Sequence, residues 1–88
     1  MHIVTRYKVN QVADENIIFI QGRNAGDMST VIALNSTSLF LWNSLYGREF
    51  DEDDAVNLLM QEFDVDHSVA LNDARGFINT LKEHKVVE

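Results

Sequence analysis

Residue types that commonly carry out catalysis or bind metals are present in this chain, but not at the spacings that such chemistry needs. The histidines His2, His67 and His84 are far apart, and no two have the i, i+4 spacing of a helical metal site. No serine is flanked by glycines as in a nucleophile elbow, and the chain has no cysteine. Fourteen acidic residues among 88 produce carboxylate pairs by chance. We therefore predict a protein that is not an enzyme and has no metal site or cofactor.

Two further segments resemble binding motifs, and each has a simpler structural interpretation. The segment from Gln21 to Ser29 contains two glycines but lacks the GxxxxGK[ST] spacing of a phosphate-binding loop, so we predict a connecting loop. The acidic run from Phe50 to Asp54 lacks the alternating aspartates and the distal glutamate of a calcium loop. Asp51 can instead cap a helix, with Asp54 at the acceptor position of a capping box.

The composition predicts one small soluble domain that spans residues 1–88. Two half-length domains would each be too small to bury a core, and no apolar run approaches the roughly 20 residues that span a bilayer. The N-terminus is not a basic-then-apolar signal segment, and the lack of cysteine is compatible with a reducing compartment. We expect a cytoplasmic protein with no membrane partner. The net charge of −7 argues against nucleic acid as the main partner, because such binding depends on cations that neutralise phosphates.

Three strands are predicted in the first part of the chain. From Ile3 to Val12, residues alternate in a pattern typical of a strand with one wetter face. Ile17 to Ile20 is a second, more buried strand, which a turn at Asp14–Asn16 joins to the first in a hairpin. The third strand runs from Thr30 to Leu34, after the loop from Gln21 to Ser29.

Three helices are predicted to follow. The first runs from an Asn35 cap to Gly47, the second begins in the acidic run, and the third runs from an Asp66 cap to about Lys85. The first is apolar nearly all round, so we expect it to be central, with Phe40 and Trp42 in the core rather than stacked on a ligand. The buried faces of the other two are predicted to consist of Ala55, Val56, Leu58, Leu59, Met60, Phe63, Ala70, Leu71, Ala74, Phe77, Ile78 and Leu81. Val86 and Val87 either return to the sheet or cover the core.

The order strand, strand, strand, helix, helix, helix predicts an α+β fold. Its elements form a three-stranded antiparallel sheet followed by three helices. Two short helices joined by a tight turn beside a small sheet suggest a winged helix-turn-helix arrangement with an N-terminal wing.

Several short motifs, in this order, resemble the PqqD-like family from about Tyr7 to Val87. They are Leu34-Asn35-Ser36-Thr37 followed by Trp42, the acidic start of the second helix, Glu62-Phe63-Asp64-Val65-Asp66, and the L-K-x-x-x-V-V ending. The resemblance implies a small winged helix-turn-helix domain that recognises ribosomally made, post-translationally modified peptides. Such a domain binds the leader of a precursor peptide and presents its core to a modifying enzyme, commonly a radical S-adenosylmethionine protein.

The resemblance also implies where a leader would bind. The leader would add as a strand beside Thr30, Val31, Ile32 and Ala33, in a groove against the third helix; an edge strand offers unpaired amides and carbonyls for this. At about 100° per residue, Val69, Asp73, Gly76 and Thr80 form one flank of that helix. The side chains of this flank are short, which has two interpretations. The flank allows a peptide backbone to lie close to the helix, or Gly76 only eases packing of the helix against the sheet.

Two features depart from the family pattern. Tyr46-Gly47-Arg48 stands where the family often has Asp-Gly, and the loop from Gln21 to Ser29 is longer than expected. An acidic chain suits a basic or neutral leader unless apolar contacts dominate.

Two other functions stay open. One is a winged-helix nucleic-acid-binding regulator, which would use Asn72, Arg75 and Asn79 to contact bases and phosphates. The other is a subunit that docks onto an enzyme or exporter without binding a leader.

Overall fold

The computed structural model describes residues 1–20 and 30–88. The strands are β1 (Val9–Val12), β2 (Glu15–Ile20) and β3 (Thr30–Leu34), and the helices are α1 (Ser36–Leu45), α2 (Glu52–Glu62) and α3 (His67–Glu83). The strands form one antiparallel sheet in the order β1-β2-β3. This arrangement confirms the predicted α+β fold. The predicted loop from Gln21 to Ser29, with Arg23, lies outside the described residues.

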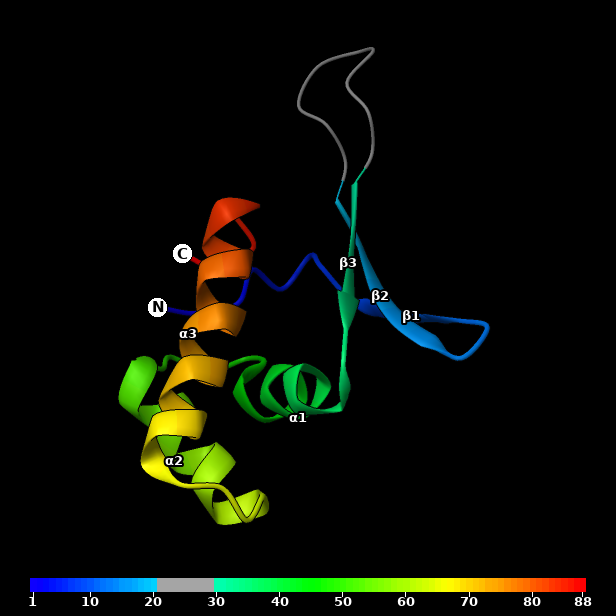
Figure 1. The fold of residues 1–88 in the computed structure, drawn as a ribbon. Coiled ribbons are helices and arrows are strands. Elements are labelled where there is room, and N and C mark those ends of the chain that lie inside the picture. The colour runs from blue at the N-terminus through cyan, green and yellow to red at the C-terminus, as the bar shows by residue number, and fades with distance from the viewer. Residues whose placement is uncertain (21–29) are drawn as a thin grey trace.

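The helices lie together on one side of the molecule, and the β1–β2 hairpin projects away from them (Figure 1). β3 is the strand of the sheet that lies nearest to α3 in this view.

The first strand is shorter than the alternation predicted, because the chain turns before it. Residues 5–6 form a turn in which the Tyr7 amide donates to the Val4 carbonyl at 3.1 Å, so the extended segment is split. Ile3 forms an isolated antiparallel bridge with Val87. The end of the chain thus pairs with its beginning rather than with the sheet. The second strand begins at Glu15, two residues early, because the turn occupies only residues 13–14.

The helix ends follow the predicted capping residues. The Asn35 side chain accepts from the Ser38 amide at 2.8 Å. Asp51 and Asp54 exchange bonds of 2.9 and 3.0 Å, which complete the capping box. Gly47, just beyond α1, has the positive φ of +83° that favours glycine. α3 ends at Glu83, two residues before the predicted end.

α1 contributes one buried face to the core, whereas its composition predicted burial on several sides. Leu41, Trp42 and Leu45 of α1 are buried. Phe40 is half-buried and packs edge-to-face on Phe63, with ring centroids 5.5 Å apart. The prediction for Met60 was wrong: its side chain is 41% exposed, because it lies about 100° around α2 from the buried Leu59. Leu58, Phe63 and Leu71 are only partly buried.

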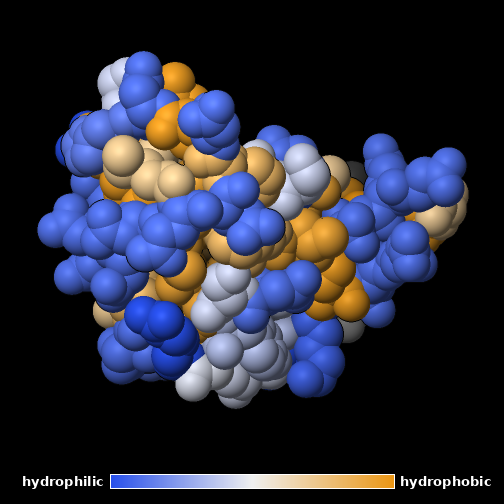
Figure 2. Space-filling view, turned by 90° about the horizontal axis from the view of Figure 1, so that it is seen from below, coloured by the Kyte–Doolittle hydropathy of each residue, from blue (hydrophilic) through white to orange (hydrophobic). Residues whose placement is uncertain are grey.

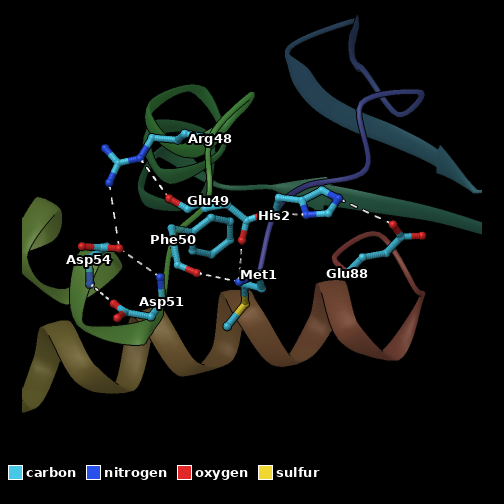
Figure 3. A network of polar contacts seen from close by, with 8 residues as sticks. All are labelled: Met1, His2, Arg48, Glu49, Phe50, Asp51, Asp54 and Glu88. Carbon is cyan, nitrogen blue, oxygen red and sulfur yellow. Dashed lines mark hydrogen bonds and ion pairs between the residues drawn. The ribbon is translucent and has the colours of Figure 1, made fainter.

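The N-terminal segment is fixed between the C-terminus and the α1–α2 connection (Figure 3). The Met1 amino group donates to the Phe50 carbonyl at 2.9 Å and pairs with Glu49 at 3.2 Å. The His2 ring lies 2.8 Å from Glu49 and 3.5 Å from Glu88. The bonds from the Met1 amino group and from His2 lower the pKa of the Glu49 carboxyl. These contacts join the N-terminal residues to the α1–α2 connection and to Glu88, five residues beyond the end of α3.

The surface reflects the acidic and polar composition. Seen from the end that carries α2, most side chains are hydrophilic, and apolar ones gather toward the middle of the view (Figure 2). Among the described residues no helix combines the length and hydropathy that crossing a bilayer requires.

Candidate functional site

β3 is an edge strand, and its outer side has no partner among the described residues. Within the sheet it pairs only with β2. An edge strand presents a row of free N–H and C=O groups to which another strand can bind. The register shows which groups of β3 these are.

The hairpin sets the alternation of backbone groups across the sheet. β1 and β2 are joined by a two-residue turn at residues 13–14, so the backbone groups of the closing pair, Val12 and Glu15, face each other. Along antiparallel strands, such pairs alternate with pairs whose backbone groups point away from each other. On β2, the groups directed toward β1 are therefore those of Glu15, Ile17 and Phe19.

The same alternation assigns the backbone groups of β3. The other residues of β2 direct their groups toward β3, where Ile18 lies opposite Ile32. The backbone groups of Ile32 are thus used inside the sheet. Those of Val31 and Ala33 point out from the free edge. A strand that added to this edge would bind to Val31 and Ala33.

A groove of about 350 Å³ runs beside this edge, between β3, the start of α1 and α3. Its apolar lining consists of Ile32, Ala33, Leu34, Phe77 and Leu81, and its polar lining of Asn35, Thr37, Ser38, Asn72, Asp73 and Thr80, with Gly76 among them. Ile32, Leu34, Phe77 and Leu81 are core residues, so the core fixes the apolar side of the groove. An apolar floor with polar groups and a free strand edge suits an extended peptide.

Gly76 leaves an open position in the α3 wall. It is exposed, and a Cβ at this position would meet no described residue within 4 Å. Gly76 therefore is not needed for close packing against the described part of the sheet, which was one of its two interpretations. The open space faces the groove, since Gly76 is part of the groove lining.

The comparisons with known proteins identify the family. The family profile "Coenzyme PQQ synthesis protein D (PqqD)" matches residues 15–87. The chain belongs to this family. A solved structure described as "TbiB1 in Complex with the TbiA(beta) Leader Peptide" is similar in fold, with a TM-score of 0.70 and 20% sequence identity over all of this chain and 95% of that chain. A search of curated proteins found no significant match.

The structure brings together five of the eight residues predicted to contact a peptide. Ile32, Ala33, Asp73, Gly76 and Thr80 all line the groove. The other three lie beside it on the same elements. Thr30 precedes the groove on β3, the Val31 side chain lies on the outer face of the sheet and is 53% exposed, and Val69 is one turn before Asp73 on α3 and is 44% exposed.

Sequence reasoning missed the contribution of α1 to the groove. Asn35, Thr37 and Ser38, at the start of α1, are part of its lining. Since Asn35 directly follows β3 and caps α1, its position next to the strand was a usable signal. Four further lining residues were also missed, although each lies next in sequence to a residue predicted for the site: Leu34, Asn72, Phe77 and Leu81.

Asp73 is the only charged side chain that lines the groove in the described part of the chain. Arg75, on the same helix, lies 3.2 Å from Glu52 of α2 and is 58% exposed. The described lining of the groove is therefore apolar and polar, with one carboxylate as its charged group. Among residues 1–20 and 30–88 no three His, Asp or Glu side chains lie close enough together to hold a metal ion.

Proposed function

We propose that this protein is a non-enzymatic adaptor that binds the leader of a ribosomally made precursor peptide and presents the peptide to a modifying enzyme. The observation that carries this proposal is the free edge of β3 beside a groove with an apolar floor. The PqqD family membership and the fold shared with a leader-bound protein support it.

The leader adds to the sheet as a fourth strand next to β3. Its backbone pairs with the edge-facing groups of Val31 and Ala33. Every second side chain of the leader then faces α3 and contacts the apolar floor formed by residues such as Ile32 and Phe77. The backbone bonds supply affinity with little sequence demand, and the floor supplies selectivity.

The two walls of the groove match in length. The part of α3 that lines the groove, from Asn72 to Leu81, covers nine residue steps, or about 14 Å at about 1.5 Å per residue. The four residue steps of β3 from Thr30 to Leu34 span about 13 Å at roughly 3.3 Å per residue. The site therefore holds about five residues of an extended leader.

The partner that receives the peptide is an enzyme of the radical S-adenosylmethionine class, as the family resemblance implies, or another peptide-modifying enzyme. The adaptor keeps the leader while the remainder of the precursor stays free to enter the enzyme. Because precursors are made on ribosomes, this role places the protein in the cytoplasm. Nucleic-acid binding is disfavoured, because Arg75 is paired with Glu52 and the groove carries a carboxylate.

The test uses precursor peptides encoded beside the gene and a substitution at the strand edge. Ala33→Pro removes an amide that points out of the sheet, a position that proline tolerates on an edge strand. We expect wild-type protein to bind one such peptide in a fluorescence anisotropy titration. Ala33→Pro should weaken binding at least tenfold while keeping the wild-type circular dichroism spectrum.

The neighbouring residue provides the matched control. Ile32→Pro removes an amide directed toward β2, so it should disrupt the sheet and lower the melting temperature far more than Ala33→Pro does. Unchanged binding by a folded Ala33→Pro protein contradicts strand addition. Failure of every neighbouring peptide to bind the wild type contradicts the adaptor function itself.

A further inference from the structure

The groove has an electrostatic feature that strand addition alone does not use. Asp73 is its one charged lining residue among those described, and its carboxylate forms no ion pair with any described residue. The nearest cation in sequence, Arg75, is engaged with Glu52. The whole chain carries a net charge of −7, so the surrounding potential reinforces this carboxylate.

The space beside Asp73 is open. Gly76 follows Asp73 by three residues, and residues three apart are neighbours on the same face of a helix. Since a Cβ at Gly76 would meet no described residue within 4 Å, a side chain from a bound peptide can occupy this space. Thr80 stands one turn further along the same flank, and its hydroxyl oxygen is a second acceptor.

The chemistry of this notch, formed by Asp73, Gly76 and Thr80, selects a cation. A carboxylate and a hydroxyl oxygen both accept hydrogen bonds from an ammonium or guanidinium group, whereas an acidic side chain placed there would be repelled by Asp73. Long basic side chains also lay their methylene groups on apolar surface such as Phe77 and keep the charged end at a polar rim.

We propose that the groove selects leaders that carry lysine or arginine at a helix-facing position, two residues away from an apolar helix-facing residue. The spacing follows from the strand, in which side chains on one face recur at every second residue, about 7 Å apart. The apolar residue contacts the floor, and the basic residue reaches the notch. This inference rests on the proposed peptide-binding function and adds the class of leader that the site accepts.

The experiment selects random dodecapeptides displayed on phage against the full chain. Parallel selections use wild type, Asp73→Lys, and Glu62→Lys as a control. Glu62 is an exposed residue at the end of α2, outside the groove lining, and its substitution makes the same change in net charge. Peptides from the wild-type selection are then tested against Ala33→Pro to identify those bound at the strand edge.

The expected result is a wild-type consensus with Lys or Arg two positions from an apolar residue. The Glu62→Lys selection should give the same consensus, and the Asp73→Lys selection should replace the basic position with Asp or Glu. In titrations with one basic peptide, Asp73→Asn should weaken binding about three- to tenfold and Asp73→Lys more than tenfold. Exchanging the basic residue of the peptide for Glu should restore binding to Asp73→Lys.

The contrary results separate this inference from the function on which it rests. Some selected peptides should bind wild type but not Ala33→Pro, which places them at the β3 edge. If these peptides have no basic position, or if the basic position persists in the Asp73→Lys selection, the cation preference is overturned and the adaptor function stands. An acidic consensus for the wild type overturns the preference as well. Recovery of no peptide that depends on the β3 edge overturns both.

Discussion

Replacing Gly76 separates the stability of the fold from the binding of a peptide. Gly76 lies in the middle of the 17-residue helix α3. Its φ is not positive, and an added Cβ would meet no described residue within 4 Å. Alanine at this position therefore introduces neither backbone strain nor a clash with the described residues. Glycine at this position lowers helix stability without relieving a contact with the described residues; the proposed peptide-binding role would account for it.

The magnitude follows from helix propensity. Glycine in an exposed helix interior is about 1 kcal/mol less favourable than alanine, so Gly76→Ala should stabilise the protein by about that amount. For a domain of this size, about 1 kcal/mol corresponds to a rise of roughly 4–8 °C in melting temperature. Gly76→Leu should give a slightly smaller gain, because leucine is also a strong helix former. Its side chain, however, fills the open space beside Asp73.

The assay pairs thermal unfolding, followed by circular dichroism at 222 nm, with titration of a peptide that depends on the β3 edge. Both variants should melt above wild type. Gly76→Ala should bind the peptide with at most a modest loss, and Gly76→Leu should bind it at least tenfold more weakly. A lower melting temperature for Gly76→Ala would refute the conclusion that position 76 is free of packing constraints. Wild-type affinity in Gly76→Leu would refute the placement of the peptide in the groove.

Three further predictions test the core, the capping box and the pH dependence. Leu59→Ala should destabilise the protein by about 2–5 kcal/mol in urea unfolding, because the Leu59 side chain is only 1% exposed. The adjacent Met60→Ala should lower the free energy of unfolding by less than about 1 kcal/mol. Equal losses in the two variants would contradict the assigned buried face of α2. Asp51→Ala should cost about 1 kcal/mol through loss of the capping box, and Asp53→Ala much less, since Asp53 is no part of it. The Val69 amide and the Ser68 hydroxyl, which donate to Asp66, lower its pKa. A lowered folded-state pKa gives stability that is present above the unfolded value and lost as the pH falls through the folded value. The stability difference between wild type and Asp66→Asn should therefore shrink as urea unfolding is repeated from pH 6 down to pH 2, and a constant difference would contradict this role.

The helix starts could be predicted because their causes are local. Asn35, Asp51 and Asp66 each accept a hydrogen bond from an amide three residues later. A bond of that range depends on residue types at fixed spacing and hardly on the rest of the fold. The same holds for Gly47, whose positive φ follows the end of α1.

The features that the sequence pattern missed depend on tertiary arrangement. The alternation of residue types predicted one strand from Ile3 to Val12. In the structure the chain turns at residues 5–6, and Ile3 pairs with Val87. No local signal marks a pairing partner 84 residues away. Met60 is apolar, but the direction from which α3 packs on α2 decides which face is buried.

Only the part of the candidate site that follows from local periodicity could be predicted from the sequence. The flank that contains Asp73, Gly76 and Thr80 follows from helical periodicity alone, and all three line the groove. The contribution of Thr37 and Ser38 depends on the angle at which α1 leaves β3, which residue spacing does not specify. The edge-facing amides required the register of the sheet.

The most direct test of the account is amide hydrogen exchange by nuclear magnetic resonance with and without a bound leader. Strand addition predicts that the amides of Val31 and Ala33, which point out from the free edge, become protected when the leader binds. The Ile32 amide, already directed toward β2, should change little. Saturating binding that leaves Val31 and Ala33 as exposed as in the free protein would contradict the central claim.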